Sequence, residues 1–373
     1  MKFKLNKSEY LSKFSLISKL DRMKITIGEN KTTNSDSLIF YSQDGKLNIF
    51  LDNGFSSINL YLGVEVDQFN SFAVDANLFN NAFSNFPSDE VQFAFIEEDH
   101  SIIFGNKKTR VSLKTSVVDN INLLLNKSFE ITDDCKFATL NISDFVESLK
   151  LTSFSCSNDI DEHPYTSIML FVEDDKFNCY SSDKHRISIY GNSYNDQKSY
   201  LMTKNSADLL LNIINKNESY EYFILKNRFY LKWNNNTFST LLENNVYQNV
   251  FSNFNKFIDD SNFELRTNIV KDEFVQSVKF IGSISSSHTI TMSFSNDQLV
   301  LSGSSSDKGT IVDKIQIDNN TSSFDVSYLT SHLVKAIETL PGNNIMFSIH
   351  NYNDFYLMIF ETEFYKHIIF PMA

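Results

Sequence analysis

The chain has little glycine, proline or cysteine. Its 373 residues include 10 Gly, 4 Pro and 3 Cys. So little glycine argues against a glycine-rich loop that holds a nucleotide cofactor, and so little proline argues against a proline-rich linker. Cys135, Cys156 and Cys179 are too few and too widely spaced for a disulfide framework or a zinc site. We therefore expect no cofactor and no bound metal.

The chain also lacks long apolar runs and groupings of catalytic residue types. No segment has the ~20 apolar residues of a membrane-spanning helix and no apolar signal segment follows Met1, so we expect a cytoplasmic protein without membrane contact. The 7 His residues show no metal-ligand spacing, and no Ser or Cys has the sequence context of a nucleophile elbow. We therefore expect a protein that is not an enzyme.

Asp183 and His185 are the residues that most invite a catalytic interpretation. They lie two positions apart on a strand-like run, which points both side chains the same way without creating a nucleophile. An unrelated hydrolase with repeated domains is the alternative, and assays of Asp183 and His185 variants for turnover would test it.

Positive charge is in deficit. The chain has 33 Lys and Arg residues against 46 Asp and Glu residues, a net charge of −13. Contacts with nucleic-acid phosphates need Lys and Arg, so the total by itself argues against nucleic acid. An acidic rim with a basic inner face would give the same total, however, so net charge does not decide the matter.

What the chain has in abundance is aromatic residues and a repeated pattern. With 35 Phe, 16 Tyr and 42% hydrophobic residues, it can fill the cores of two or three domains. Six times a short strand-like run leads through a cap residue into an amphipathic helix, at intervals of about 56 to 68 residues. The predicted caps are Ser8, Asp75, Ser143, Asn205, Lys271 and Ser327.

Strand-like segments fill the space around these helices. The runs before the helices are 2–5, 71–74, 137–140, 200–202, 264–267 and 323–326, and alternating segments include 38–41, 47–51, 91–96, 111–115, 168–172 and 290–294. Asp44-Gly45 predicts a hairpin turn. Each unit is a strand, a helix and about three more strands, and the units pair. The pattern predicts an α+β protein of three domains, at residues 1–128, 129–258 and 259–373.

Two motifs add a family resemblance. The segment Tyr180-Ser-Ser-Asp-Lys-His-Arg-Ile-Ser-Ile189 resembles the Thr-Asp-Gly-His-Arg-Leu segment of the bacterial sliding clamps, the beta subunits of DNA polymerase III. The chain end, Ile368-Ile-Phe-Pro-Met-Ala373, resembles the Val-Met-Pro-Met ending of that family. Together, and on a sixfold repeat, they identify the chain as a divergent member.

The resemblance implies the DNA clamp (processivity) fold: three similar domains of two β-α-β-β-β units each, with helices lining a ring and sheets outside. It implies a head-to-tail homodimer that encircles double-stranded DNA without regard to sequence. It also implies two protein partners, the replicative DNA polymerase, which the clamp tethers, and the clamp loader. The alternative is a clamp-like scaffold that binds proteins but no longer encircles DNA.

Site residues are implied by the same resemblance. The peptide-binding cleft comprises Thr166, Ser182, Asp183, His185, Arg186, Ile187, Gln248, Asn253, Ile368, Phe370, Pro371 and Met372. The DNA-binding set is Lys13, Arg22, Lys24, Lys150, Tyr165, Lys204 and Lys271, and the dimer interface is Val111, Leu113, Phe280 and Ile281. Thr166, Gln248 and Asn253 stand where the family has apolar or proline residues.

The chain departs from the family pattern at two further places. Lys184 stands where the family has Gly, so the turn is expected either to be reshaped or to offer a basic group at the cleft. The segment 158–162 is acidic near the place where the family contacts DNA. The partner peptide and the host, phage or cell, stay open.

Overall fold

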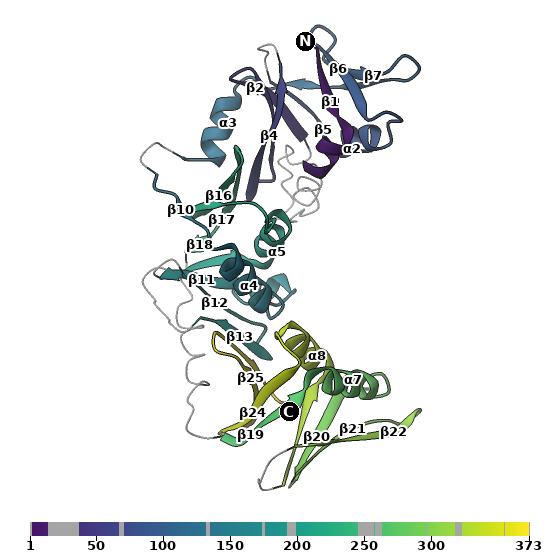
Figure 1. The fold of residues 1–373 in the computed structure, drawn as a ribbon, viewed down its shortest axis with the longest axis vertical. Coiled ribbons are helices and arrows are strands. Elements are labelled where there is room, and N and C mark those ends of the chain that lie inside the picture. The colour runs from purple at the N-terminus through teal and green to yellow at the C-terminus, as the bar shows by residue number, and fades with distance from the viewer. Residues whose placement is uncertain are drawn as a thin grey trace. The chain divides into compact units, whose positions relative to one another are not determined.

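The computed structural model describes residues 2–13, 37–66, 71–131, 135–173, 176–191, 199–244, 257, 263–295, 297–317, 323–353 and 355–372. The chain forms two compact units, Met1–Ile142 with Leu209–Leu242 and Ser143–Asp208 with Glu243–Ala373. Each unit contains two antiparallel sheets and the helices packed on them (Figure 1).

The first unit holds a four-stranded and a nine-stranded sheet. The order β1-β6-β7-β8 is made by β1 (Lys2–Asn6), β6 (Glu90–Ile96), β7 (Ser101–Gly105) and β8 (Arg110–Lys114). The order β10-β15-β16-β17-β4-β3-β2-β5-β9 is made by β10 (Ala138–Thr139), β15 (Glu221–Leu225), β16 (Arg228–Trp233), β17 (Asn236–Leu241), β4 (Ser56–Glu65), β3 (Lys46–Asp52), β2 (Ser37–Gln43), β5 (Phe72–Asp75) and β9 (Ser116–Val117).

The second unit repeats this arrangement. Its nine-stranded sheet, β18-β14-β11-β12-β13-β26-β25-β24-β19, is made by β18 (Glu243–Asn244), β14 (Tyr200–Thr203), β11 (Ser167–Glu173), β12 (Lys176–Ser182), β13 (Arg186–Tyr190), β26 (Tyr365–Ile369), β25 (Phe355–Glu361), β24 (Asn344–Tyr352) and β19 (Phe263–Val270). Its four-stranded sheet, β22-β21-β20-β23, is made by β22 (Gly309–Gln316), β21 (Gln298–Ser305), β20 (Thr289–Ser295) and β23 (Phe324–Leu329).

All the strand-like segments expected from the sequence lie in or overlap strands. Asp44 and Gly45 join β2 to β3 with positive φ angles of 52° and 71°, as a type I′ hairpin turn requires. Each nine-stranded sheet joins strands from two of the three expected domains, through β17–β4 in one sheet and β13–β26 in the other. The division into three domains stays a prediction.

Helices follow the predicted strand runs, but their caps differ from prediction. The helices are α2 (Ala76–Ser84), α3 (Ile121–Ser128), α4 (Ile142–Ser153), α5 (Lys204–Ile213), α7 (Lys271–Gly282) and α8 (Thr330–Thr339), with a short 3₁₀ helix η1 (Ile160–Glu162) and helical residues at 7–13. Asp75 caps α2 as predicted, because its carboxylate accepts the Leu78 N–H at 2.7 Å. Helix α3 was not part of the sixfold pattern.

The other predicted caps were wrong. Asn6 accepts the Glu9 N–H at 3.1 Å, so Ser8 lies inside the first helix. Thr203 accepts the Ser206 N–H at 3.2 Å, so Asn205 lies inside α5. Ser143 is likewise inside α4, and Lys271 is the first residue of α7. Ser327 lies in strand β23, three residues before α8.

Aromatic side chains fill the core of the first unit. Phe79 and Phe83, four residues apart on α2, both point at the four-stranded sheet, and both are fully buried. The Phe83 ring meets that of Phe93 on β6 at a centroid distance of 5.3 Å and that of Phe104 on β7 at 5.8 Å. Burying each such ring stabilises the fold by about 1.5–3 kcal/mol, so these rings fix α2 on one face of this sheet.

Candidate peptide-binding surface and DNA-facing residues

The turn between β12 and β13 holds the first motif in a fixed shape. The Asp183 carboxylate accepts the His185 and Arg186 backbone N–H groups, each at 3.1 Å, and the Arg186 Nε–H at 2.7 Å. A second guanidinium nitrogen of Arg186 donates to the Phe154 carbonyl at 2.7 Å. Both side chains are mostly buried, so this ion pair shapes the turn and leaves neither group available as a catalyst.

The second motif lies beside the first because β26 pairs with β13. In this antiparallel register Ile368 stands opposite Ile187 and Ile369 opposite Arg186. Beyond β26 the Phe370 N–H donates to the His185 carbonyl at 3.0 Å, and the Met372 N–H donates to the Ser327 carbonyl at 2.8 Å. The chain end is therefore held by main-chain hydrogen bonds on both sides.

Several aromatic side chains cover the core next to this chain end. Ile187 and Ile368 belong to a buried cluster against which Tyr165, Phe257, Tyr352 and Phe370 pack while staying partly exposed. The Phe257 ring meets the Phe370 ring edge-on at 5.3 Å and the Tyr352 ring at 4.9 Å. We call Tyr165, Phe257, Tyr352 and Phe370 the aromatic surface.

The sequence reached only part of this surface. Phe370 was predicted, whereas Phe257 and Tyr352 were missed because they come from segments far from either motif. Ser182, Ile187 and Ile368 lie beneath the surface with at most 1% exposure, while Pro371 and Met372 extend beyond it. Thr166 directly follows Tyr165 and is half-buried. Gln248 and Asn253 lie outside the described residues.

Lys184 keeps the backbone shape that a glycine would favour. Its φ is 72°, so the turn is not reshaped, at a conformational cost of about 1–2 kcal/mol. Its ammonium group pairs with the Glu162 carboxylate at 2.9 Å and lies over the Tyr165 ring at 5.3 Å. These exposed contacts are worth about 0.2–1 kcal/mol each and offset part of that cost. The acidic segment 158–162 thus has a partner in Lys184.

Three histidines lie in and beside this region. The His185 and His332 rings are 6.1 Å apart, and His332 is half-buried on α8. Burial, and then the Arg186 guanidinium, lower the pKa of His332 to about 4. Complete burial lowers the pKa of His367 well below its usual range. The His367 Nδ1 is 2.6 Å from the Ser188 hydroxyl, which is 2.6 Å from that of Ser155. Ser188 and His367 are both inaccessible, so they form a structural network.

The predicted DNA contacts differ in how far they are engaged. Lys150 on α4 is exposed with no hydrogen bond to the described residues. Lys204 donates to Asn158 Oδ1 at 2.6 Å, and Lys13 donates to the Tyr61 carbonyl at 2.6 Å. Lys271 donates to the Leu340 carbonyl and, at 3.2 Å, to that of Glu338, at the end of α8. Arg22 and Lys24 lie outside the described residues.

The predicted interface residues lie on or next to the edge strands of the two four-stranded sheets. Val111 is half-buried on β8, while Leu113 is 7% exposed and belongs to its own sheet. Phe280 on α7 is 60% exposed, and Val312 on the edge strand β22 is 54% exposed. Ile281 is fully buried in its own core, so Phe280 rather than Ile281 presents an apolar side chain to solvent.

Two kinds of feature are absent from the described part of the chain. Among the residues that the structure describes, no helix is long and apolar enough to cross a membrane. The same residues include no group of three or more His, Cys, Asp or Glu side chains arranged to hold a metal ion.

Known proteins resemble this chain along its length. Residues 261–373 match the family described as DNA polymerase III beta subunit, C-terminal domain. A beta sliding clamp of Rickettsia bellii (strain RML369-C) is 21% identical over 292 residues, which cover 76% of this chain and 74% of that protein.

Solved structures agree with this match. The DNA polymerase sliding clamp from Bacillus subtilis superposes with a TM-score of 0.83 at 16% identity, over 100% of this chain and 99% of that one. The DNA polymerase III subunit beta from Pseudomonas aeruginosa superposes with a TM-score of 0.82 at 13% identity, over 100% of both chains. The predicted sliding-clamp fold is confirmed.

Proposed function

We propose that the protein is a processivity factor, because residues 261–373 belong to the C-terminal domain family of the DNA polymerase III beta subunits and the whole chain is a divergent relative of the beta sliding clamps. It would encircle duplex DNA as a head-to-tail homodimer and tether the replicative DNA polymerase, after a clamp loader opens the ring. Its task is mechanical, so no catalytic residue is required. Work on intracellular DNA implies a cytoplasmic location.

The observation that carries the tethering proposal is the aromatic surface. Its rings rest on a fully buried cluster, and the adjoining main chain is fixed by the Phe370–His185 and Met372–Ser327 hydrogen bonds. A rigid, partly exposed apolar surface loses little entropy when a peptide with apolar anchors binds it. The nearby groups Asp183 and Arg186 are already paired with each other, so the anchors rather than new ion pairs would supply affinity.

Duplex DNA would be held by diffuse charge. A closed ring needs no base contacts, and contacts with phosphates confer no sequence preference. Lys150 is the most available of the predicted residues, and Lys204 needs to give up only a surface hydrogen bond. Lys13 and Lys271 are tied to carbonyl groups, so we assign them a smaller share of the DNA contact.

Ring closure would use the exposed edges of the four-stranded sheets. β8 ends one sheet and β22 ends the other, and unpaired sheet edges are a liability in a free protein. Two copies arranged head to tail would join β8 of each to β22 of the other, with Phe280, Val312 and Val111 as apolar contacts.

Sedimentation velocity tests this assembly. We expect the wild-type protein to sediment as a dimer and Phe280→Asp to sediment as a monomer, because a buried unpaired carboxylate is costly. Phe364→Asp is the matched control, since Phe364 is also an exposed phenylalanine, at 49%, but lies in a turn of the other sheet. A monomeric wild type, or a Phe280→Asp protein that stays dimeric, would contradict the interface.

A further inference from the structure

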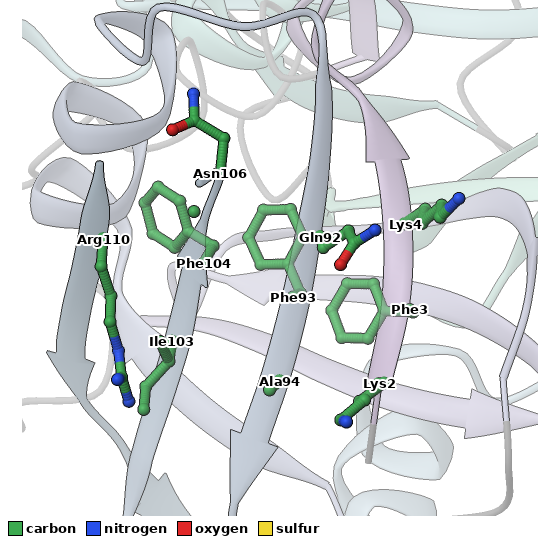
Figure 2. Close-up of a pocket in the computed structure, with 11 residues that line it drawn as sticks. Lys2, Phe3, Lys4, Gln92, Phe93, Ala94, Ile103, Phe104, Asn106 and Arg110 are labelled. Carbon is green, nitrogen blue, oxygen red and sulfur yellow. The ribbon is translucent and has the colours of Figure 1, made fainter. Parts of the chain in front are cut away.

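The four-stranded sheet of the first unit carries a hollow that none of the roles above uses. It has a volume of about 490 Å³. Lys2 and Lys4 project from β1 on one side and Arg110 from β8 on the other, with β6 and β7 between them (Figure 2). We call it the cationic hollow, defined by Lys2, Lys4, Ala94, Gly105 and Arg110.

Strand register places these residues on a single face. Lys4 stands opposite Gln92, Gln92 opposite Gly105, and Gly105 opposite Arg110, so the four form one row across the sheet. In the next row Lys2 stands opposite Ala94. Because side chains alternate along a strand, Phe3, Phe93 and Phe104 point to the opposite face. That opposite face is covered by α2 through Phe83, so the hollow faces away from this helix.

Small residues create the depression. Ala94 and Gly105 lie between the long side chains of β1 and β8. Gly105 also has a structural reason to be glycine, because a Cβ there would be 2.4 Å from the Thr109 carbonyl oxygen. The tight approach of the β7–β8 turn therefore keeps the centre of the row free of a side chain.

The hollow concentrates positive charge on an acidic protein. Lys2, Lys4 and Arg110 are exposed, and none has an ion pair with a carboxylate among the described residues. Lys107 and Lys108, in the adjoining turn, extend the positive region, while Glu90 is the one acidic residue in these four strands. In a chain with a net charge of −13, this face is suited to an anionic ligand.

We propose that the cationic hollow is a docking surface for an acidic, extended segment of a partner protein. Lys2 and Lys4 are about 7 Å apart along the strand, the spacing of alternate side chains in an extended peptide. Arg110 lies three strand spacings away from Lys4, about 14 Å, which leaves room for one peptide strand between the two walls. Carboxylates on alternate sides of that peptide reach both walls.

Single-stranded nucleic acid fits this face less well. Its binding sites combine positive charge with aromatic side chains on which bases stack. The aromatic side chains of these four strands lie on the opposite face, beneath α2. The docking surface is also separate from the aromatic surface, and the proposal does not depend on the proposed function.

Fluorescence anisotropy with a labelled (Glu-Ser)4 peptide tests the proposal. We expect binding that weakens with salt, no binding of (Gln-Ser)4, and an affinity about tenfold lower for Lys4→Gln/Arg110→Gln, because each lost ion pair contributes up to about 1 kcal/mol. The matched control is Lys114→Gln/Lys127→Gln, which removes the same charge elsewhere in this unit and should bind (Glu-Ser)4 as wild type does.

Three results would overturn it. Equal binding of (Gln-Ser)4 would remove the requirement for carboxylates. An equal loss in the control pair would show attraction to the whole surface rather than to the hollow. Tighter binding of the oligonucleotide dT8, abolished by Lys4→Gln/Arg110→Gln, would assign the hollow to nucleic acid. Phe370→Ala should bind (Glu-Ser)4 normally, which separates this test from that of the aromatic surface.

Discussion

Burial of two histidines makes the stability of the protein depend on mildly acidic pH. The pKa of His332 falls from 6.5 to about 4 in the folded state, and that of His367 is lowered too. Unfolded chains therefore bind more protons, so this part of the stability is complete above pH 6.5 and is lost as pH falls towards 4.

A His332→Gln variant tests this dependence. We expect the loss of unfolding free energy between pH 6.5 and 4.5, measured by urea denaturation, to be about 1 kcal/mol smaller than in wild type, once solvent screening at this half-exposed ring is taken into account. His100→Asn, in an exposed turn, should leave the pH dependence unchanged. An unchanged pH dependence in His332→Gln would show that His332 is not held neutral.

Phe370 joins the fold of the chain end to the proposed peptide contact. We expect Phe370→Ala to reduce binding of a labelled peptide with Leu and Phe anchors at least ~10-fold, because truncating a central aromatic anchor typically costs 2 kcal/mol or more. Removal of its packing on Phe257 should lower the unfolding free energy by about 1–2 kcal/mol. Phe364→Ala is the control, and equal affinity of the two variants would remove Phe370 from the site.

Single residues also mark the limit of prediction from sequence. Phe370 was found because it stands in a recognisable chain end. Phe257 and Tyr352 were not, because only tertiary packing brings them to Phe370. Lys184 kept a positive φ, an outcome that the identity of the residue alone argues against.

Strands and helices were predicted better than the residues that end them. Alternation of apolar residues located the strands, since each has one buried face. The cap positions shifted because Ser, Thr, Asn and Asp all compete for that role, and Asn6 and Thr203 took it from Ser8 and Asn205. Helix α3 was missed because it has no buried apolar stripe; Leu123 is 65% exposed.

The cap of α2 provides a prediction for an element. Asp75→Ala should lower the unfolding free energy by about 1 kcal/mol, because the Leu78 N–H loses its acceptor and a negative charge leaves the positive helix end. Asp75→Asn should retain most of the stability. Chemical denaturation measures both, and equal losses in the two variants would show that the side-chain hydrogen bond is not the cause.

For the whole molecule, the sliding-clamp fold could be predicted because the sixfold pattern and two motifs agreed on one architecture. The assembly could not be predicted to the same depth, because apolar residues at an interface and in a core look alike in sequence. Ile281 and Phe280 are neighbours, yet one is fully buried and the other is 60% exposed. Net charge was equally ambiguous, since its distribution decides its effect.

The central claim is that the protein encircles DNA, and threading onto a linear duplex tests it without a loader. The duplex is fixed to beads by one end, the protein is added, and the free end is then closed by a bulky protein block. We predict that the protein survives a high-salt wash and leaves when a restriction enzyme cuts the duplex, because the link is topological and does not depend on screened charges. Loss in the wash, equal to that from a duplex left open, would contradict encirclement and favour a scaffold that binds proteins alone.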